Sequence, residues 1–341
     1  MRLILAILAI VTVLGGYTGY WYWLSDRLLD GVIGWAAAQR DKGHDIAFDR
    51  IERSGFPYRI RIDVVNPQAV VSRGKESGEW RAERVWAIVQ PWKLNHVIGS
   101  VEGRQDIAWS DGGKQHTAML ASETNRFSLV LDGAGQPLRF ALDMTAPSWR
   151  PSDGPPLDAA RARLFVRANH GDEAGLPAGS YNVALSAETL KLPDVGKPLP
   201  FGPVVQEVAV ESLVTGPLRA DRSWRKSLLA WRDGGGRIEV GRFAAIWGDL
   251  DLQAEGTLTL DDERRPAGTL TTRIAGFNEA VDALVQTGTV RNKDANLIKI
   301  ALALLAKPTV DGRPTLTAPL SATDGRVYLG PAKLLKVRPL F

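Results

Sequence analysis

The chain has 341 residues, with 42 Lys and Arg, 38 Asp and Glu and no cysteine, giving a formal net charge of +4. A nucleic-acid binder is expected to concentrate its basic residues on one face. Here they are scattered among acidic ones, so we expect no nucleic-acid partner. Without cysteine, thiol nucleophiles, thiolate metal sites and disulfides are excluded.

Residues 3–24 contain no charged side chain. A helix of this length spans about 33 Å, which matches the roughly 30 Å hydrocarbon core of a bilayer. We therefore expect residues 1–24 to be a transmembrane signal anchor. Aromatic rings favour the headgroup level of a membrane, and an interface belt is predicted from five of them at the exit end: Tyr17, Tyr20, Trp21, Tyr22 and Trp23.

A cleaved secretory signal is the alternative interpretation of this segment. It requires a shorter apolar stretch followed by small residues at the cleavage site, whereas bulky aromatic residues occupy that place here. Two residues before the segment are too few for a domain, so we expect them inside the cell and the rest of the chain exported. No second apolar run is long enough to cross a membrane, which predicts a single-pass protein.

Residues 25–45 show apolar side chains at helical spacing, which predicts a juxtamembrane helix that ends near Gly43. From Ile46 the periodicity changes to two, which is typical of strands. Alternating apolar and polar residues between turn signals predict further strands. These strands contain Tyr58–Val64, Trp86 and Ile88, Phe127–Leu131, Phe140 and Leu142, and Val183–Ala187.

The clearest predicted strand is Ile246–Leu260, because apolar residues occupy its even positions. With residues 236–240 and 268–275 it predicts an antiparallel meander. Helices are predicted over 223–232, 277–287 and 293–305, and the last two are expected to cover the apolar face of the sheet. The fold class is therefore mainly β, a β-rich α+β fold with long curved antiparallel sheets and a few covering helices. Residues 46–341 form one β domain, with a possible internal boundary in the loop-like stretch 147–156.

The sequence offers little reactive chemistry. His44, His96, His116 and His170 occur singly, without the spacing of metal ligands, so we assign no metal. Nucleophile motifs are missing, and the glycine-rich stretch 234–241 leads into a strand where a phosphate loop would need a helix. We expect no cofactor and no catalytic residue. A hydrolase with two carboxylates far apart in the sequence stays a remote alternative, because it would leave no short motif.

Apolar side chains on one face of a strand either fill a core or line a groove for an apolar ligand. Trp80, Trp86 and Trp92 recur every six positions, which in a strand places them on one face. Core packing is the more common role of such residues, and coverage by the helices at 277–287 and 293–305 would rule the groove out. The candidate groove lining is Leu250, Leu252, Ala254, Leu258, Leu260, Trp86 and Trp92.

Several motifs resemble the Gram-negative family catalogued as domain of unknown function 2125. They are the N-terminal anchor, Gly55-Phe56-Pro57-Tyr58, Gln90-Pro91-Trp92, Trp247-Gly248-Asp249-Leu250, Gly256-Thr257-Leu258, then Asp261, Pro266 and Gly268, and Gly330-Pro331. The resemblance covers nearly the whole chain, but its strand and turn motifs identify a fold family and no reaction. The C-terminal third also resembles AsmA-like envelope proteins, which implies a role in moving or accommodating phospholipid.

Together these features predict a non-enzymatic protein, anchored in the bacterial inner membrane through residues 3–24 with most of the chain in the periplasm. Its apolar-faced sheet is expected to bind or accommodate lipid in envelope maintenance. The alternative is a structural or assembly partner that docks other envelope proteins through sheet edges or the loop at 147–156. Phospholipid and envelope proteins are thus the two partner classes to test.

Overall fold

The computed structural model describes residues 2–73, 76–111, 113–171, 176–194, 196, 199–217, 224–286, 291–308, 314–330 and 332–340. The contacts within the chain divide it into two compact units. The first unit comprises Met1–Leu138 and Ser148–Gly154, and the second comprises Arg139–Pro147 and Pro155–Phe341. The predicted boundary at 147–156 concerns independently folding domains and stays a prediction.

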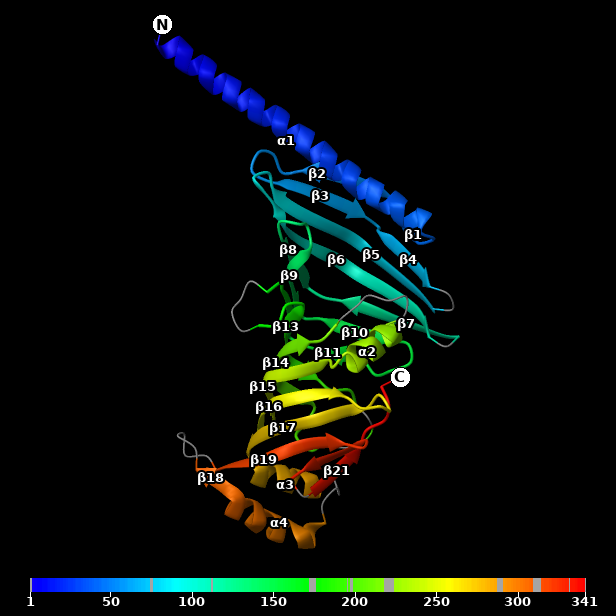
Figure 1. The fold of residues 1–341 in the computed structure, drawn as a ribbon, viewed down its shortest axis with the longest axis vertical. Coiled ribbons are helices and arrows are strands. Elements are labelled where there is room, and N and C mark those ends of the chain that lie inside the picture. The colour runs from blue at the N-terminus through cyan, green and yellow to red at the C-terminus, as the bar shows by residue number, and fades with distance from the viewer. Residues whose placement is uncertain are drawn as a thin grey trace. The chain divides into compact units, whose positions relative to one another are not determined.

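The first unit begins with a single uninterrupted helix, α1 (Arg2–Asp41), that includes both the apolar segment 3–24 and the predicted juxtamembrane helix. Its N-terminal part projects beyond the strands, and its C-terminal part lies along them (Figure 1). Gly43, at φ +84°, ends the helix as expected: its amide donates to the Arg40 carbonyl, and the amide of His44 donates to that of Gln39. These two bonds satisfy carbonyl groups that the last helical turn would leave unpaired.

Antiparallel strands make up the rest of the first unit. β2 pairs with β3, β3 with β5, and β5 with β6, while β4 pairs with both β1 and β5. β6 also pairs with β7 and β8, and β7 pairs with β10. The strands are β1 (Asp45–Ala47), β2 (Arg50–Ser54), β3 (Ile60–Val65), β4 (Gln68–Arg73), β5 (Glu76–Gln90), β6 (Lys93–Asp111), β7 (Lys114–Ala121), β8 (Thr124–Leu131) and β10 (Ser148–Pro151).

Two local expectations for this unit are wrong. Residues 147–156 were expected to form a loop. Residues 152–156 are irregular, but Ser148–Pro151 form β10, which lies against Ala118–Ala121 of β7. Trp92 was expected in a strand with Trp80 and Trp86, but it lies with Pro91 in the two-residue turn that joins β5 to β6. The regular spacing of the tryptophans therefore runs past the end of the strand.

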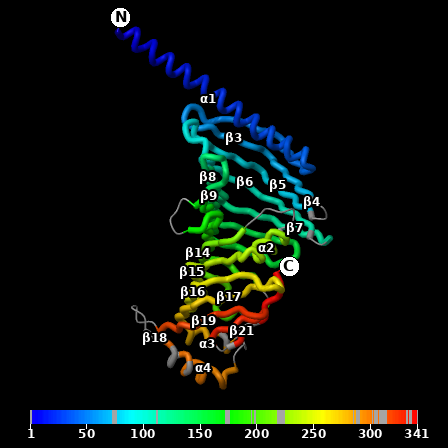
Figure 2. Tube along the Cα trace, viewed as in Figure 1, coloured from blue at the N-terminus to red at the C-terminus, as the bar shows by residue number. Residues whose placement is uncertain are grey.

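The second unit is a meander of antiparallel strands in the order β9, β12, β13, β14, β15, β16, β17, β19, β20 and β21. Its central part, from β14 to β17 and β19, can be followed in Figure 2. This confirms the mainly β fold with few helices. The strands are β9 (Pro137–Thr145), β11 (Leu157–Asp158), β12 (Arg161–Asn169), β13 (Ser180–Lys191), β14 (Val204–Thr215), β15 (Arg237–Trp247), β16 (Leu250–Leu260), β17 (Pro266–Ala275), β18 (Ala306–Pro308), β19 (Pro314–Thr323), β20 (Arg326–Leu329) and β21 (Ala332–Lys336). The helices are α2 (Trp224–Asp233), α3 (Phe277–Gln286) and α4 (Asn292–Leu305).

The predicted strand Ile246–Leu260 is wrong at its start, because the chain reverses direction at Gly248 and Asp249. Trp247 of β15 pairs directly with Leu250 of β16, so Gly248-Asp249 is a two-residue hairpin loop. Gly248 adopts φ +59°, which such a loop requires and which glycine tolerates best. The reversal places Ile246 on the opposite face from Leu250 and Leu252.

The expected coverage of the sheet by α3 and α4 holds only in part. Phe277 and Val281 of α3 are each 4% exposed and therefore packed. On α4, however, Leu297 is 72% and Ile300 is 60% exposed, so these side chains do not cover the sheet. The side chains of Ala301, Leu304 and Leu305, expected on the same side of α4, lie outside the described residues.

The turn between β16 and β17 contains an ion pair between Asp261 and Arg265, and the aspartate makes the pair sensitive to acid. The Asp261 carboxylate accepts hydrogen bonds from the backbone amide of Arg265 at 2.8 Å and from its Nε at 2.7 Å. Burial alone would raise the pKa of Asp261, but these bonds outweigh it and lower the pKa below its usual value.

A carboxyl group whose pKa is depressed in the folded state stabilises the fold above its unfolded-state pKa of about 3.9. That stabilisation is lost as the pH falls through the folded-state value. We expect Asp261→Asn to lower the denaturation midpoint at pH 7 and to lose less further stability at pH 3 than the parent chain. Tryptophan fluorescence of the full chain in detergent measures both. Asp262→Asn, in the same turn, is the control, and equal pH dependence in all three chains would contradict the expectation.

Candidate functional site

The aromatic end of the apolar segment, in the middle of α1, is bound to two turns of the first unit by side-chain hydrogen bonds. Tyr17 donates from its hydroxyl to the carbonyl of Pro57 at 2.5 Å, and Tyr20 donates to that of Pro91 at 2.8 Å. Trp21 donates from Nε1 to the Arg59 carbonyl at 3.1 Å. The predicted belt residues therefore also hold the strands, a role that the sequence analysis did not foresee.

Apolar packing accompanies these bonds. Trp21 is 3% exposed and forms a buried cluster with Leu24 and Ile60 of β3, against which Leu28 and Val89 pack. Each such side chain contributes roughly 1.5–3 kcal/mol when fully buried. This cluster holds α1 against β3 and β5.

An arginine of β2 adds a charged contact at the same place. Arg53 forms an ion pair with Asp26 and donates to Ser25 Oγ at 3.3 Å, and its guanidinium lies 5.4 Å from the centre of the Tyr22 ring. Ser25 is fully buried, and its hydroxyl donates to the Tyr22 carbonyl at 2.9 Å. We call the aromatic residues 17–22, the turns 55–59 and 91–92, and Arg53 the anchor joint.

The second candidate surface is one face of the meander in the second unit. Pairing aligns apolar side chains across many strands in rows. One row crosses nine strands: Met144, Ala162, Ala187, Val208, Ala245, Leu252, Ile274, Leu316 and Ala306. A neighbouring row contains Leu142, Leu164, Leu185, Val210, Phe243 and Ala254. We call these two rows the apolar face.

The opposite face of the same strands carries paired charges. Arg161 contacts Asp143 at 2.6 Å, and Arg273 contacts Glu255 at 3.0 Å. Arg163 pairs with Glu188, and Arg242 pairs with Glu211 at 3.2 Å. Strand pleating separates the two faces. One side of the sheet is therefore suited to water, whereas the other lacks charge.

The candidate groove lining is divided between the two units. Leu250, Leu252, Ala254, Leu258 and Leu260 share one face of β16; Ala254 is 6% exposed and the four leucines are half-buried. Trp86 and Trp92 belong to the first unit. Trp86 donates to Glu102 Oε1 at 2.6 Å and lies 4.6 Å below the Arg61 guanidinium, so charged groups surround it, while Trp92 is 62% exposed. That these residues line a ligand groove stays a prediction.

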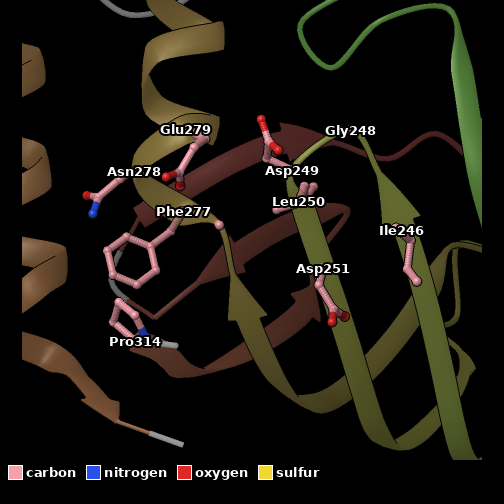
Figure 3. A pocket seen from close by; sticks show the side chains of 10 residues that line it. Ile246, Gly248, Asp249, Leu250, Asp251, Phe277, Asn278, Glu279 and Pro314 are labelled. Carbon is pink, nitrogen blue, oxygen red and sulfur yellow. The ribbon is translucent and has the colours of Figure 1, made fainter. Parts of the chain in front are cut away.

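A cavity of about 470 Å³ lies beside the Gly248-Asp249 turn in the second unit (Figure 3). Asp249 and Asp251 flank it from the hairpin, and Phe277, Asn278 and Glu279 do so from the first turn of α3. Gly276 joins β17 to α3 at φ +74°, where a Cβ atom would lie 1.9 Å from the Asp249 carbonyl oxygen, so the close approach requires glycine. The remote alternative of a hydrolase with two carboxylates far apart in the sequence stays a prediction.

A histidine–aspartate pair in the first unit was not predicted, because its two residues are far apart in the sequence. His116 Nδ1 lies 2.5 Å from Asp153 Oδ2, and the imidazole stacks on the Trp109 ring. The hydrogen bond from His116, followed by that from Lys114, lowers the pKa of Asp153. In the part of the chain that the structure describes, no group of three or more His, Asp or Glu residues could hold a metal ion.

The fold and its surfaces define a class of protein: an antiparallel β protein with an apolar N-terminal helix that is able to span a membrane by length and composition. The model of a bacterial family described as uncharacterized proteins conserved in bacteria (DUF2125) matches residues 21–338, and the chain belongs to this family. No curated protein and no solved structure matches at a significant level. The resemblance to AsmA-like envelope proteins stays a prediction.

The anchor joint predicts different effects for two tryptophans of the same helix. Trp21→Ala removes a buried ring and should cost about 3–5 kcal/mol of local stability. Trp23→Ala, at a position 56% exposed, should cost under about 1 kcal/mol. Hydrogen exchange of the β3 amides in the full chain measures both, and equal protection in the two variants would show that α1 does not stabilise β3.

Proposed function

We propose that this protein is anchored in the inner membrane by residues 3–24, holds its β units in the periplasm, and accommodates lipid acyl chains on the apolar face without catalysing a reaction. The observation that carries the proposal is the chemistry of the two sheet faces. One face pairs its charges within the sheet, and the other presents rows of apolar side chains of which most are partly buried, Ala254 and Leu316 are buried and Leu185 is exposed.

The dimensions of the apolar face fit an extended acyl chain. Neighbouring strands lie about 4.8 Å apart, so the row from Leu142 to Ala254, which crosses six strands, is roughly 24 Å long. One leaflet of a bilayer provides about 15 Å of hydrocarbon thickness, half of its core. A lipid chain lying across the strands would therefore find apolar contacts along its whole length.

Partial exposure leaves free energy to be gained on binding. Leu185 is 51% exposed although it stands in the middle of its row. Burial of apolar surface contributes roughly 25 cal/mol per Å², so an acyl chain would gain a favourable contribution wherever it covers surface that is still exposed, as at Leu185. The support is physical complementarity between an uncharged, ridged surface and an uncharged chain.

Two exposed residues on neighbouring strands provide a matched test. Leu185 on the apolar face is 51% exposed, and Phe165 on the opposite face is 49% exposed. We expect p-benzoylphenylalanine to cross-link phospholipid when it replaces Leu185 and not when it replaces Phe165, in the full chain within native membranes. Mass spectrometry of the irradiated protein reads out the adduct. Equal lipid adducts at both positions, or none at either, would contradict the proposal.

A second candidate function is docking of another envelope protein, and it is favoured by α4. Leu297 and Ile300 expose 72% and 60% of their surface on one side of this helix. Exposed apolar patches on folded proteins commonly mark interaction sites. This candidate requires a protein partner, whereas the first requires lipid.

A charge substitution on α4 tests the second candidate. We expect Leu297→Glu to abolish a protein cross-link that forms in native membranes, because a buried carboxylate in an apolar contact is costly. Asn296→Glu adds the same charge at the neighbouring exposed position and should leave the cross-link intact. A cross-link that survives both substitutions, or that is lost with both, would exclude Leu297 as the contact.

A further inference from the structure

The two turns of the anchor joint expose an unusual set of aromatic side chains. Phe56 is 48% exposed, Tyr58 75% and Trp92 62%. The neighbouring helix residues Tyr22 and Trp23 are 47% and 56% exposed. Exposed rings concentrated in this way are typical of proteins that contact the headgroup region of a membrane.

Hydrogen bonds to α1 fix the depth of these turns relative to the anchor. Tyr17, which donates to the Pro57 carbonyl, lies seven residues before Leu24, a rise of roughly 10 Å along the helix. Tyr20, which donates to Pro91, lies four residues before Leu24. If residues 3–24 span the bilayer, both turns lie at the same depth as the aromatic residues at the C-terminal end of that segment.

The backbone chemistry of the turns suits an environment with little water. A buried carbonyl without a hydrogen bond is costly in apolar surroundings, and side chains of α1 satisfy the carbonyls of Pro57, Arg59 and Pro91. The two prolines carry no amide hydrogen that would need an acceptor. The amide of Arg59 donates to the Gly55 carbonyl at 3.1 Å.

Basic side chains beside the rings match lipid phosphates. Arg59, the last residue of the first turn, and Lys93, which directly follows the second, are both exposed. Arg27 lies one helical turn beyond Trp23, and its guanidinium is 5.5 Å from the centre of that ring. Aromatic rings with adjacent Lys and Arg form the usual combination at the membrane interface.

We infer that the turns 55–59 and 91–92 insert into the same membrane interface as the aromatic residues 17–23 of α1. The first unit then contacts the lipid surface through three points, which are the helix and the two turns. The inference rests on the proposed anchor and is independent of lipid binding by the apolar face. Continuity with the anchor makes a bilayer the occupant of this surface.

The natural absence of cysteine allows a direct test by site-directed spin labelling. The full chain is reconstituted in bilayers of phosphatidylethanolamine and phosphatidylglycerol, with one nitroxide at Tyr58→Cys or Trp92→Cys. Both side chains are exposed, and the donors of the joint's hydrogen bonds are side chains of α1, so labelling leaves these bonds in place. Collision with oxygen and with a water-soluble nickel complex reports immersion.

Two control positions make the outcomes separable. The first, Val11→Cys, is within the apolar segment. The second, Gln115→Cys, is at an exposed position of β7 that pairs with Ser110, near the far end of β6 and about 60 Å along that strand from Lys93. We expect the oxygen-to-nickel collision ratio at Tyr58 and Trp92 to be several-fold higher than at Gln115 and to approach that at Val11.

Each contrary result has a distinct meaning. Nickel access at Tyr58 and Trp92 equal to that at Gln115, with Val11 immersed, would overturn this inference and leave the anchor intact. Nickel access at Val11 would overturn the anchor and this inference together. Protection of Tyr58 and Trp92 from both oxygen and nickel would indicate a protein contact and would also overturn the inference.

Discussion

Three backbone carbonyls determine how the first unit is attached to its helix. Pro57, Arg59 and Pro91 stand in turns, where no neighbouring strand can pair with them, and side chains from α1 supply the missing donors. Because β3 pairs with β5 and β5 with β6, bonds at two turns fix the orientation of three strands. The helix is therefore a structural element of the unit as well as its apolar extension.

The second unit depends on a different constraint, which is the need of a sheet to cover its apolar face. A sheet usually meets this need by packing against a second layer. The described parts of α2 and α3 bury individual side chains, among them Trp231, Phe277 and Val281. Most side chains in the rows of the apolar face nevertheless remain partly exposed. A sheet in this condition gains stability from any apolar partner of sufficient length, which is why its two faces suggest a binding surface.

Local patterns in the sequence predicted the helices and strands better than they predicted the contacts between them. The alternation in Leu250–Leu260 and the helical spacing in residues 277–286 specify β16 and α3 directly, because each repeats along one element. The Gly248-Asp249 turn was overlooked because apolar residues happen to keep an even spacing across it, although a Gly-Asp pair between strands is itself a hairpin signal. The apolar side of α4 was misplaced for another reason: amphipathic spacing identifies an apolar side and does not identify what covers it.

The candidate sites were harder to predict because they depend on long-range pairing. The bond between Tyr20 and Pro91 joins residues 71 positions apart, and no periodicity records it. The rows of the apolar face likewise require the register of many strands, which short motifs do not specify. The five β16 residues could be grouped from sequence because they alternate along one strand. The charged neighbours of Trp86 come from β3 and β6, and the sequence does not show that these strands lie beside it.

The motifs that carry the family resemblance make sense as geometric requirements. Gly55, at φ +101°, leaves room beside the Arg59 carbonyl that Trp21 binds, since a Cβ atom there would lie 2.7 Å from that oxygen. Pro57 and Pro91 offer carbonyls to α1 without amides that would need partners. These two motifs of the first unit therefore lie where the backbone of a turn meets α1. Displacement of either turn would remove hydrogen bonds that join α1 to the ends of β3, β5 and β6, so the geometry of these motifs and the attachment of the helix depend on each other.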